Sequence, residues 1–281
     1  MTASSGRAAL AAALALAAGI APPAWADGAP TPVRSSLDLG VGLGAVSFPA
    51  YPGSEEVRKL LIPFPYIVYH STYLDVNRDQ VRGKVLKDEH WSLDVDFGGQ
   101  VQVKSADVQE RQGMPDRDWL GEVGPALRYF IWNGEEPGTH LDAVLPVRAA
   151  VSAQGLTITR RGWVTGPRLE GHEELQGPGD RVDLDATLTA DYVDRQFANY
   201  YYGVAPQFAT TTRPAYDAPG GYAGWNLNLG FSWHHGDLVY GGFVAYTSLH
   251  GAAFQASPLV ARANGLSMGF AVSWVIQRIR E

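Results

Sequence analysis

Three groups of residues in this 281-residue chain have the side chains that hydrolytic chemistry requires. These groups are His234-His235 with Asp237, His70-Ser71, and Asp116 with Asp118. Catalysis needs a nucleophile, a base and an orienting group within hydrogen-bond distance of one another, and no spacing here dictates such a set. Neighbouring residues of a strand point to opposite faces, which weakens His234 and His235 as a dyad. We therefore predict no catalytic residue and no enzyme activity.

The composition gives little support to metal or cofactor chemistry. The chain has seven histidines and no cysteine. The lack of cysteine excludes disulfides, thiolate nucleophiles, cysteine-ligated zinc and a lipid-modified N-terminus of the mature chain. The histidines show no ligand spacing beyond chance, so we predict no metal site and no cofactor. The net charge is −7 and the basic residues form no stripe, which argues against nucleic acid as a partner.

The first 26 residues have the layout of a secretory signal peptide. Arg7 precedes the apolar run of residues 8–20, and Ala24-Trp-Ala26 comes before Asp27. The 13 residues of that run are fewer than the roughly 20 of a membrane-spanning helix. We therefore predict cleavage after Ala26, which leaves a single mature domain over residues 27–281 with a net charge of −8.

The clearest element that could position polar side chains is a predicted strand over residues 91–103. One face of it is apolar and the other is polar. The two faces hold Trp91, Leu93, Val95, Phe97, Val101 and Val103, and Ser92, Asp94, Asp96, Gln100 and Gln102. The alternation is longer than the usual strand of about 5–6 residues and covers the roughly 9–11 that cross a bilayer at a tilt.

The same two-residue period recurs through most of the mature chain, and short turns alternate with long loops. Strands are predicted at residues 37–45, 59–69, 119–132, 141–151, 182–192, 225–233, 240–246 and 266–276, with a weaker one at 162–169. Residues 170–180 are predicted to be a polar connection, and residues 193–224 a long irregular segment. The pattern predicts an all-β fold, a transmembrane antiparallel up-and-down β-barrel. Because such barrels have even strand numbers, twelve strands are favoured, with the extra strand hidden in residues 72–86 or 193–224, and ten is the alternative.

A soluble β-sandwich would also alternate apolar and polar residues, but two features favour the barrel. Aromatic residues stand at strand ends, as in the interfacial girdles of membrane barrels. They are Trp91, Trp119, Trp132, Tyr192, Trp225, Trp233 and Trp274. The polar face, moreover, is charged in mid-strand and rich in glycine, as expected of a wet or ion-paired lumen. We therefore predict that lipid surrounds the domain.

The predicted lumen face carries charges of both signs. Its members are Asp94, Asp96, Glu122, Arg128, Asp142, Arg148, Asp183, Asp185 and Asp191, joined by Arg82 and Lys84. Buried charges must be paired, and a barrel of ten to twelve strands has a narrow lumen. A network of ion pairs that fills the lumen is therefore favoured over a cation-attracting pore, and any conductance would be small and weakly cation-selective.

Several ordered segments together resemble the MipA/OmpV family of outer-membrane proteins. They are Tyr51, Pro52, Gly53 and Ser54 after a glycine-alternating strand; Pro63 to Tyr66; Tyr201, Tyr202, Gly203 and Val204; Tyr216 and Asp217; and Ser257 and Pro258. The closing strand, predicted at residues 269–276, departs from the usual pattern. Ile276 stands where a terminal phenylalanine is common, and a tail of residues 277–281 follows.

The resemblance implies a barrel in the outer membrane of a Gram-negative bacterium. It also implies a scaffold or structural envelope protein, with a lytic transglycosylase and a peptidoglycan synthase as partners, or else a porin or adhesin. Three hypotheses follow: a non-enzymatic scaffold, a small porin-like channel for small solutes, and a barrel enzyme. The tyrosines of residues 192–222 are expected either to form a binding surface for sugars or a partner, or to anchor an outer loop at the headgroup level or fold it over the lumen.

Overall fold

The computed structural model describes residues 36–70, 74–76, 81–134, 138–154 and 157–280. The expected signal peptide and Ser71 lie outside these ranges, while the described residues belong to one compact unit. Its strands are β1 (Ser36–Pro49), β2 (Val57–His70), β3 (Leu74–Val76), β4 (Val81–Lys87), β5 (Trp91–Gln100), β6 (Trp119–Asn133), β7 (His140–Gln154), β8 (Thr157–Thr165), β9 (Arg168–Gly177), β10 (Asp180–Val193), β11 (Gly221–His235), β12 (Leu238–Ser248) and β13 (Asn264–Arg280).

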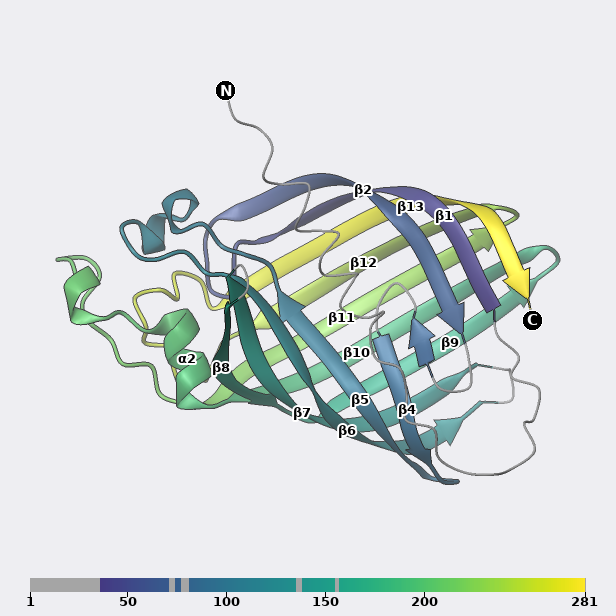
Figure 1. Ribbon diagram of the computed structural model, residues 1–281, viewed down its shortest axis with the longest axis horizontal. Helices are drawn as coiled ribbons and strands as arrows, with labels where there is room; N and C mark the ends of the chain where they lie inside the picture. The colour runs from purple at the N-terminus through teal and green to yellow at the C-terminus, as the bar shows by residue number, and fades with distance from the viewer. Residues whose placement is uncertain (1–35, 71–73, 77–80, 135–137, 155–156, 281) are drawn as a thin grey trace. The chain divides into compact units, whose positions relative to one another are not determined.

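The strands form one closed antiparallel sheet (Figure 1). Apart from β8 and β9, each strand pairs with the next along the chain, and β13 returns to pair with β1 from Ser36↔Arg280 to Ser47↔Met268. Strands β8 and β9 lie end to end in one position of the sheet, because both pair with β7 on one side and with β10 on the other. The thirteen strands of the described residues therefore occupy twelve positions. The structure confirms the antiparallel β-barrel.

Strand β9 corrects the prediction that residues 170–180 are a connection. Its lumen-facing positions are Arg168, Glu170, His172 and Glu174, and its outward positions include Gly171 and Glu173 between Leu169 and Leu175. The apolar half of the alternation is interrupted, so the segment resembles a polar loop in sequence. Antiparallel pairing with β10 over ten residue pairs fixes it as a strand nonetheless.

The outward face of the barrel is apolar. On β6, Val123 and Leu127 are 43% and 45% exposed, whereas Ala126 and Arg128 between and beside them are buried. Phe97 and Leu188 are likewise exposed on β5 and β10. A bilayer supplies the apolar solvent that such a surface needs, because these side chains gain nothing from contact with water.

Aromatic rings meet in pairs towards both ends of the strands. The pairs are Trp91–Tyr129 and Trp233–Tyr240 towards one end, and Tyr192–Tyr222 and Trp225–Tyr246 towards the other, with ring centroids 4.6, 5.1, 5.5 and 5.3 Å apart. Rings of this kind prefer the headgroup level of a membrane. The two sets bracket the apolar band as the predicted girdles should.

Long and short connections lie at opposite ends (Figure 1). Residues 50–56, 101–118, 194–220 and 249–263 lie at one end, which we call the loop end. Residues 88–90, 178–179 and 236–237 lie at the other, the turn end, together with the end of β13.

Short helices lie only in the long connections, as far as the described ranges show. They are η2 (Ser105–Asp107), η3 (Gln109–Arg111), α2 (Arg195–Tyr202) and η4 (Pro206–Phe208). The Asp194 side chain caps α2 by accepting a hydrogen bond from Phe197 N at 2.9 Å. Among the residues described, no helix is long and apolar enough to span a membrane.

Three strand boundaries differ clearly from those predicted. The weaker strand expected at residues 162–169 is divided, because β8 ends at Thr165 and β9 begins at Arg168. Strand β5 ends at Gln100, and Val103 instead forms an isolated bridge with Arg117 and is buried. Strand β13 continues to Arg280, because the residues expected as a tail pair with the start of β1.

Among the described residues, the part of the barrel wall between β2 and β5 has the shortest strands. Strand β3 has three residues, and it pairs with β2 only at Tyr69 and His70. Towards the loop end the two sides are joined by Arg58 Nη1, which donates to Gln102 O at 3.0 Å, and by Glu55 N, which donates to Glu110 Oε1 at 2.9 Å.

Candidate functional site: the lumen network and the loop cap

Arg128 is the centre of the charged wall of the lumen. Its guanidinium contacts Asp94 at 3.2 Å, Asp142 at 2.6 Å and Glu170 at 2.7 Å. Arg128, Asp94 and Asp142 are at most 3% exposed. A single buried cation thus ties together β5, β6, β7 and β9, and charge-assisted bonds of this kind are stronger than neutral ones.

Two more arginines extend the contacts into a continuous network. Arg148 contacts Asp96 at 2.8 Å and Glu122 at 3.0 Å. Arg168 contacts Asp96 at 2.8 Å and Glu170 at 2.8 Å. Because Asp96 and Glu170 are shared, the three arginines and their carboxylates form one cross-linked group on the inner face. We call this group the lumen network.

The predicted residues Asp183 and Asp185 lie apart from the lumen network, on the turn side of β10. Asp183 Oδ2 is 3.0 Å from His234 Nε2 and 3.2 Å from Arg181 Nη2. Asp185 Oδ1 is 2.8 Å from His172 Nδ1. These two aspartates form a second polar cluster with histidines that the sequence did not bring together.

The remaining predicted lumen residues are less constrained. Asp191 lies on the same face of β10, and no ion pair within 4.0 Å joins it to another described side chain. Arg82 and Lys84 lie opposite Asp96 and Asp94 in the strand register, but their side chains fall outside the described residues.

The opposite wall of the lumen is apolar. Tyr66, Val239 and Val275 are buried together on β2, β12 and β13, with Phe64 packed against them. The Phe64 ring lies on Gly42, where a Cβ would meet it at 2.5 Å. The lumen therefore has one ion-paired wall and one wall in which aromatic rings cover glycines.

The histidines and the aspartate of residues 234–237 each contact a different partner. His234 faces Asp183, whereas His235 pairs with Asp180 at 2.6 Å on the other face of the sheet. Asp237 pairs with Arg278 at 2.8 Å. The structure therefore does not bring these three side chains together, and of His70-Ser71 the serine lies outside the described residues.

The two aspartates of the loop between β5 and β6 are also separate from each other. Asp116 accepts a hydrogen bond from Ser105 N at 2.7 Å, and Asp118 lies 3.7 Å from Arg161. Asp116 thus holds the backbone of its own loop, and Asp118 contacts a side chain of β8.

The four long connections pack together over the loop end of the barrel, and we call residues 50–56, 101–118, 194–220 and 249–263 the cap. Tyr51 OH donates to Leu259 O at 2.7 Å, and Tyr202 OH donates to Pro52 O at 2.9 Å. Ser257 Oγ donates to Tyr202 O at 2.7 Å. These contacts lock together three connections that are distant in sequence.

The other residues that carried the family resemblance also hold the cap. Gly53 has φ +103 and its carbonyl accepts from Ala261 N at 2.8 Å. Val204 and Tyr216 exchange two backbone hydrogen bonds, and Asp217 pairs with Arg195. The tyrosines of α2 thus fold into the cap and pack against Val103, Val108 and Phe254.

Arg111, which the sequence did not single out, is the most buried cation of the cap. It is 1% exposed, and it donates to Pro115 O at 3.0 Å, Ser105 Oγ at 3.2 Å and Tyr201 O at 3.4 Å. Within the described ranges no carboxylate lies within 4.0 Å of it. Backbone carbonyls and a hydroxyl thus satisfy the guanidinium, and a hydrophobic pattern gives no sign of such a residue.

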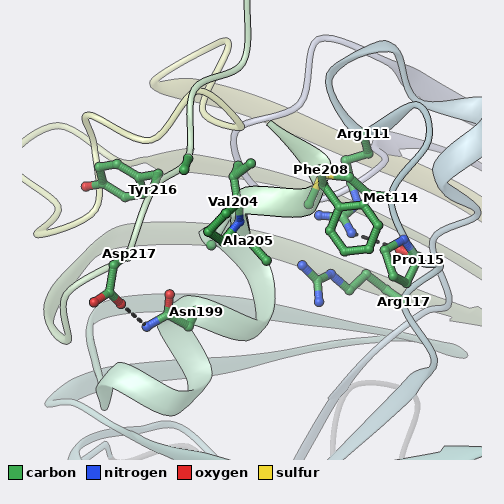
Figure 2. A pocket seen from close by; sticks show the side chains of 13 residues that line it. Arg111, Met114, Pro115, Arg117, Asn199, Val204, Ala205, Phe208, Tyr216 and Asp217 are labelled. Carbon is green, nitrogen blue, oxygen red and sulfur yellow. Dashed lines mark hydrogen bonds between the residues drawn. The ribbon is translucent and has the colours of Figure 1, made fainter. Parts of the chain in front are cut away.

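A cavity of about 600 Å³ lies beside Arg111 in the cap (Figure 2). Arg111 and Arg117 lie at one side near Phe208, and Asn199 and Asp217 lie at the other. Burial and the positive charge of Arg111 lower the pKa of Arg117 to about 9. A wall with guanidinium groups, an aromatic ring and an amide suits small polar or anionic groups.

Three cap tyrosines are strongly shielded from water. Burial raises the pKa of Tyr51, Tyr201 and Tyr202 above the ordinary value, because a phenolate would have to leave water. The hydroxyls therefore stay neutral, and those of Tyr51 and Tyr202 donate hydrogen bonds within the cap.

Comparison with solved structures gives similarity to outer-membrane barrels at low sequence identity. Outer membrane phospholipase A from Escherichia coli has 10% identity and a TM-score of 0.28, covering 84% of this chain and 92% of that one. A FadL homologue from Pseudomonas aeruginosa has 7% identity and a TM-score of 0.27, covering 87% and 90%. The outer membrane protease OmpT from Escherichia coli has 7% identity and a TM-score of 0.27, covering 92% and 99%. Similarities this weak say nothing about function.

The family comparison is decisive. No curated protein matches the chain significantly. The model of the family described as MltA-interacting protein MipA, in contrast, matches residues 41–276, from the first strand of the barrel to the last. This chain therefore belongs to the MipA family and is an outer-membrane β-barrel protein of the Gram-negative envelope.

Proposed function

We propose that the protein is a non-enzymatic scaffold of the outer membrane whose lumen is closed and whose turn end recruits peptidoglycan-remodelling enzymes. The observation that supports the proposal is the combination of a charged inner wall with a packed cap. The lumen network cross-links β5, β6, β7 and β9 around the buried Arg128, and Tyr51 and Tyr202 join the connections of the cap at the loop end. We infer that these two features close the lumen, so that the barrel acts through its surfaces.

The family name supplies the class of partner. It names MltA, and the resemblance noted above implies that this partner is a lytic transglycosylase acting with a peptidoglycan synthase. Short turns of outer-membrane barrels face the periplasm, where peptidoglycan lies. We therefore assign partner binding to the turn end.

Acidic residues mark that end. Asp88 and Glu89 are exposed in the turn between β4 and β5. Asp180, the first residue of β10, and Asp237, in the turn before β12, have side chains 41% and 63% exposed. Exposed charges at an interface contribute to the rate and specificity of association. A partner surface that is basic would fit this group.

Capture of purified MltA on the detergent-solubilised barrel tests the proposal. Wild type should retain MltA, and the double charge reversal Asp88→Lys with Glu89→Lys should lower retention several-fold. Glu55→Lys is the matched control, because Glu55 is 56% exposed at the loop end. Failure of wild type to retain MltA, or loss of retention in the control alone, would refute the scaffold role.

A small, weakly cation-selective channel is the second candidate. It is favoured by the face of β10 and β11 that carries Asp191, Thr187, Thr189, Asn226 and Asn228, which leaves part of the lumen polar and outside the lumen network. The electrical current through single inserted barrels distinguishes this candidate from the scaffold.

The non-enzymatic assignment is tested by lipid and peptide hydrolysis assays. We expect no turnover by wild type, because His234 and His235 point to opposite faces. Turnover that disappears in His234→Ala would contradict the assignment.

A further inference from the structure

The second polar cluster of the lumen contains three side chains arranged like metal ligands. His172 and Glu174 lie two residues apart on β9, and Asp183 lies opposite Glu174 on β10. One ligand atom from each lies within 4.8 Å of the others. All three side chains are half-buried, at the turn end of the inner face.

We propose that His172, Glu174 and Asp183 bind a divalent transition-metal ion. The backbone fixes this set, because residues two apart on a strand share a face and the register places Asp183 beside Glu174 and Asp185 beside His172. The sequence alone does not predict this site, because residues 170–180 resemble a polar loop, in which a spacing of two residues does not place side chains on one face.

Neighbouring groups orient the ligands. Asp185 Oδ1 lies 2.8 Å from His172 Nδ1, so that Nδ1 is engaged and Nε2 is left for a metal. His234 Nε2 lies 3.0 Å from Asp183 Oδ2. Metal-binding histidines generally donate their second ring nitrogen to a carboxylate or carbonyl in this way.

Among the described residues, the other charged and ring groups that face the set are compatible with an ion. Arg181 Nη2 lies 3.2 Å from Asp183 Oδ2 and 3.1 Å from His234 Nε2, but its side chain is 44% exposed and can turn to solvent. Gln176 donates to Glu174 Oε1 at 2.6 Å and leaves the other oxygen. The ring of His140 stacks on His172 with centroids 5.4 Å apart and limits its rotation.

The donor set selects the class of ion. One imidazole with two carboxylates and no thiolate suits Zn²⁺, Co²⁺, Ni²⁺ or Cu²⁺. Ca²⁺ and Mg²⁺ prefer oxygen ligands alone and in larger number. An ion held here would join β9 to β10 beside the turn of residues 178–179 and should stabilise that end of the barrel.

The test uses the refolded full barrel in detergent, carrying no polyhistidine tag. Zn²⁺ titration calorimetry should give one site, and Co²⁺ should develop visible absorption bands of a site with nitrogen and oxygen ligands. His172→Ala and Glu174→Gln should abolish the site. His234→Ala should weaken it by about 10–100-fold, as expected when an orienting partner is removed.

His235→Ala is the matched control, because His235 adjoins His234 but lies on the other face beside Asp180. It should bind Zn²⁺ like wild type. The shift between folded and unfolded bands on gels checks that each variant has refolded, and Zn²⁺ should raise the melting temperature of wild type and the control only.

Three results would overturn the proposal. They are the absence of a Zn²⁺ site in the refolded wild type, equal Zn²⁺ binding by folded His172→Ala, and displacement of Zn²⁺ by equimolar Ca²⁺. The capture of MltA is independent of this ion, so failure of one proposal leaves the other standing.

Discussion

At the scale of single residues, the lumen depends on arginines that are shared among carboxylates. Arg128 serves Asp94, Asp142 and Glu170 at once, and it is 3% exposed. Taking such charges out of water is expensive, and only close pairing makes it tolerable. Because neighbouring arginines share carboxylates, removal of one arginine also alters the charge balance around the next.

Replacement of Arg128 by methionine should destabilise the barrel strongly. The change removes the cation among three carboxylates, and breaking a buried pair typically costs about 3–5 kcal/mol. Arg278→Met is the control, because the Arg278–Asp237 pair is 42% and 63% exposed and such pairs contribute about 0–1 kcal/mol. Urea unfolding in detergent, followed by tryptophan fluorescence, measures both. Equal losses in the two variants would contradict the account.

Tyr51, Tyr201 and Tyr202 in the cap should lose their protons only at a pH above the ordinary tyrosine pKa. Their pKa values are raised in the folded state, so the folded state holds protons that the unfolded state releases above pH of about 10, and stability falls as pH rises through that value. Tyrosinate absorbance should be the same in folded wild type and Tyr202→Phe near that pH. In denaturant the variant should lose the signal of one tyrosine. A difference between the folded proteins would show that Tyr202 is accessible.

The sequence predicts residue orientation well and residue partners poorly. Alternation alone places Asp94, Asp96 and Arg128 on the inner face, where the structure has them. Which carboxylate meets Arg128 depends on register between strands, and Glu170 was missed entirely. Arg111 could not be found, because carbonyls satisfy its charge and no pattern in sequence records them.

At the scale of elements, β8 and β9 together occupy one strand position of the barrel. A glycine between them allows both to pair with β10. Gly166 has φ +156, and a Cβ there would collide with the carbonyl oxygen of Ala190 on β10. Pro167 follows and its carbonyl accepts from Ala190 N at 3.1 Å. The backbone between β8 and β9 therefore lies directly against β10 at Ala190.

Gly166→Ala should lower the yield of folded barrel and its unfolding temperature. An added methyl must push β10 away, and the backbone conformation disfavours alanine as well. Gly121→Ala on β6 is the control, since its Cβ meets nothing within 4 Å. Refolding into detergent micelles, scored by the gel shift of the folded band, compares them. A yield for Gly166→Ala equal to that of the control would argue against this role of Gly166.

Strands can be predicted from the sequence where apolar residues occupy the outward positions without interruption. Strands β5, β6, β7 and β10 meet that condition over most of their length. Strand β9 does not, because Gly171 and Glu173 take outward positions, and helix α2 has eight residues, too few for a helical period to stand out. Tertiary pairing supplies the information that the local pattern lacks in both cases.

At the scale of the whole barrel, the proposed closure of the lumen rests on the lumen network and the cap. Arg128 and Arg148 cross-link the strands of one wall, while Phe64 and Tyr66 fill the other. The cap joins four connections through buried hydroxyls and the fully buried Arg111. Most of the residues that carried the family resemblance lie in the cap and join its connections.

The direct test of a closed, surface-acting barrel is the current through single molecules in planar bilayers. Flotation of the same preparation on lipid vesicles verifies insertion. The account predicts no open steps above the current of the lipid alone. Stable, cation-selective open steps from the inserted wild-type protein would contradict it and establish the channel.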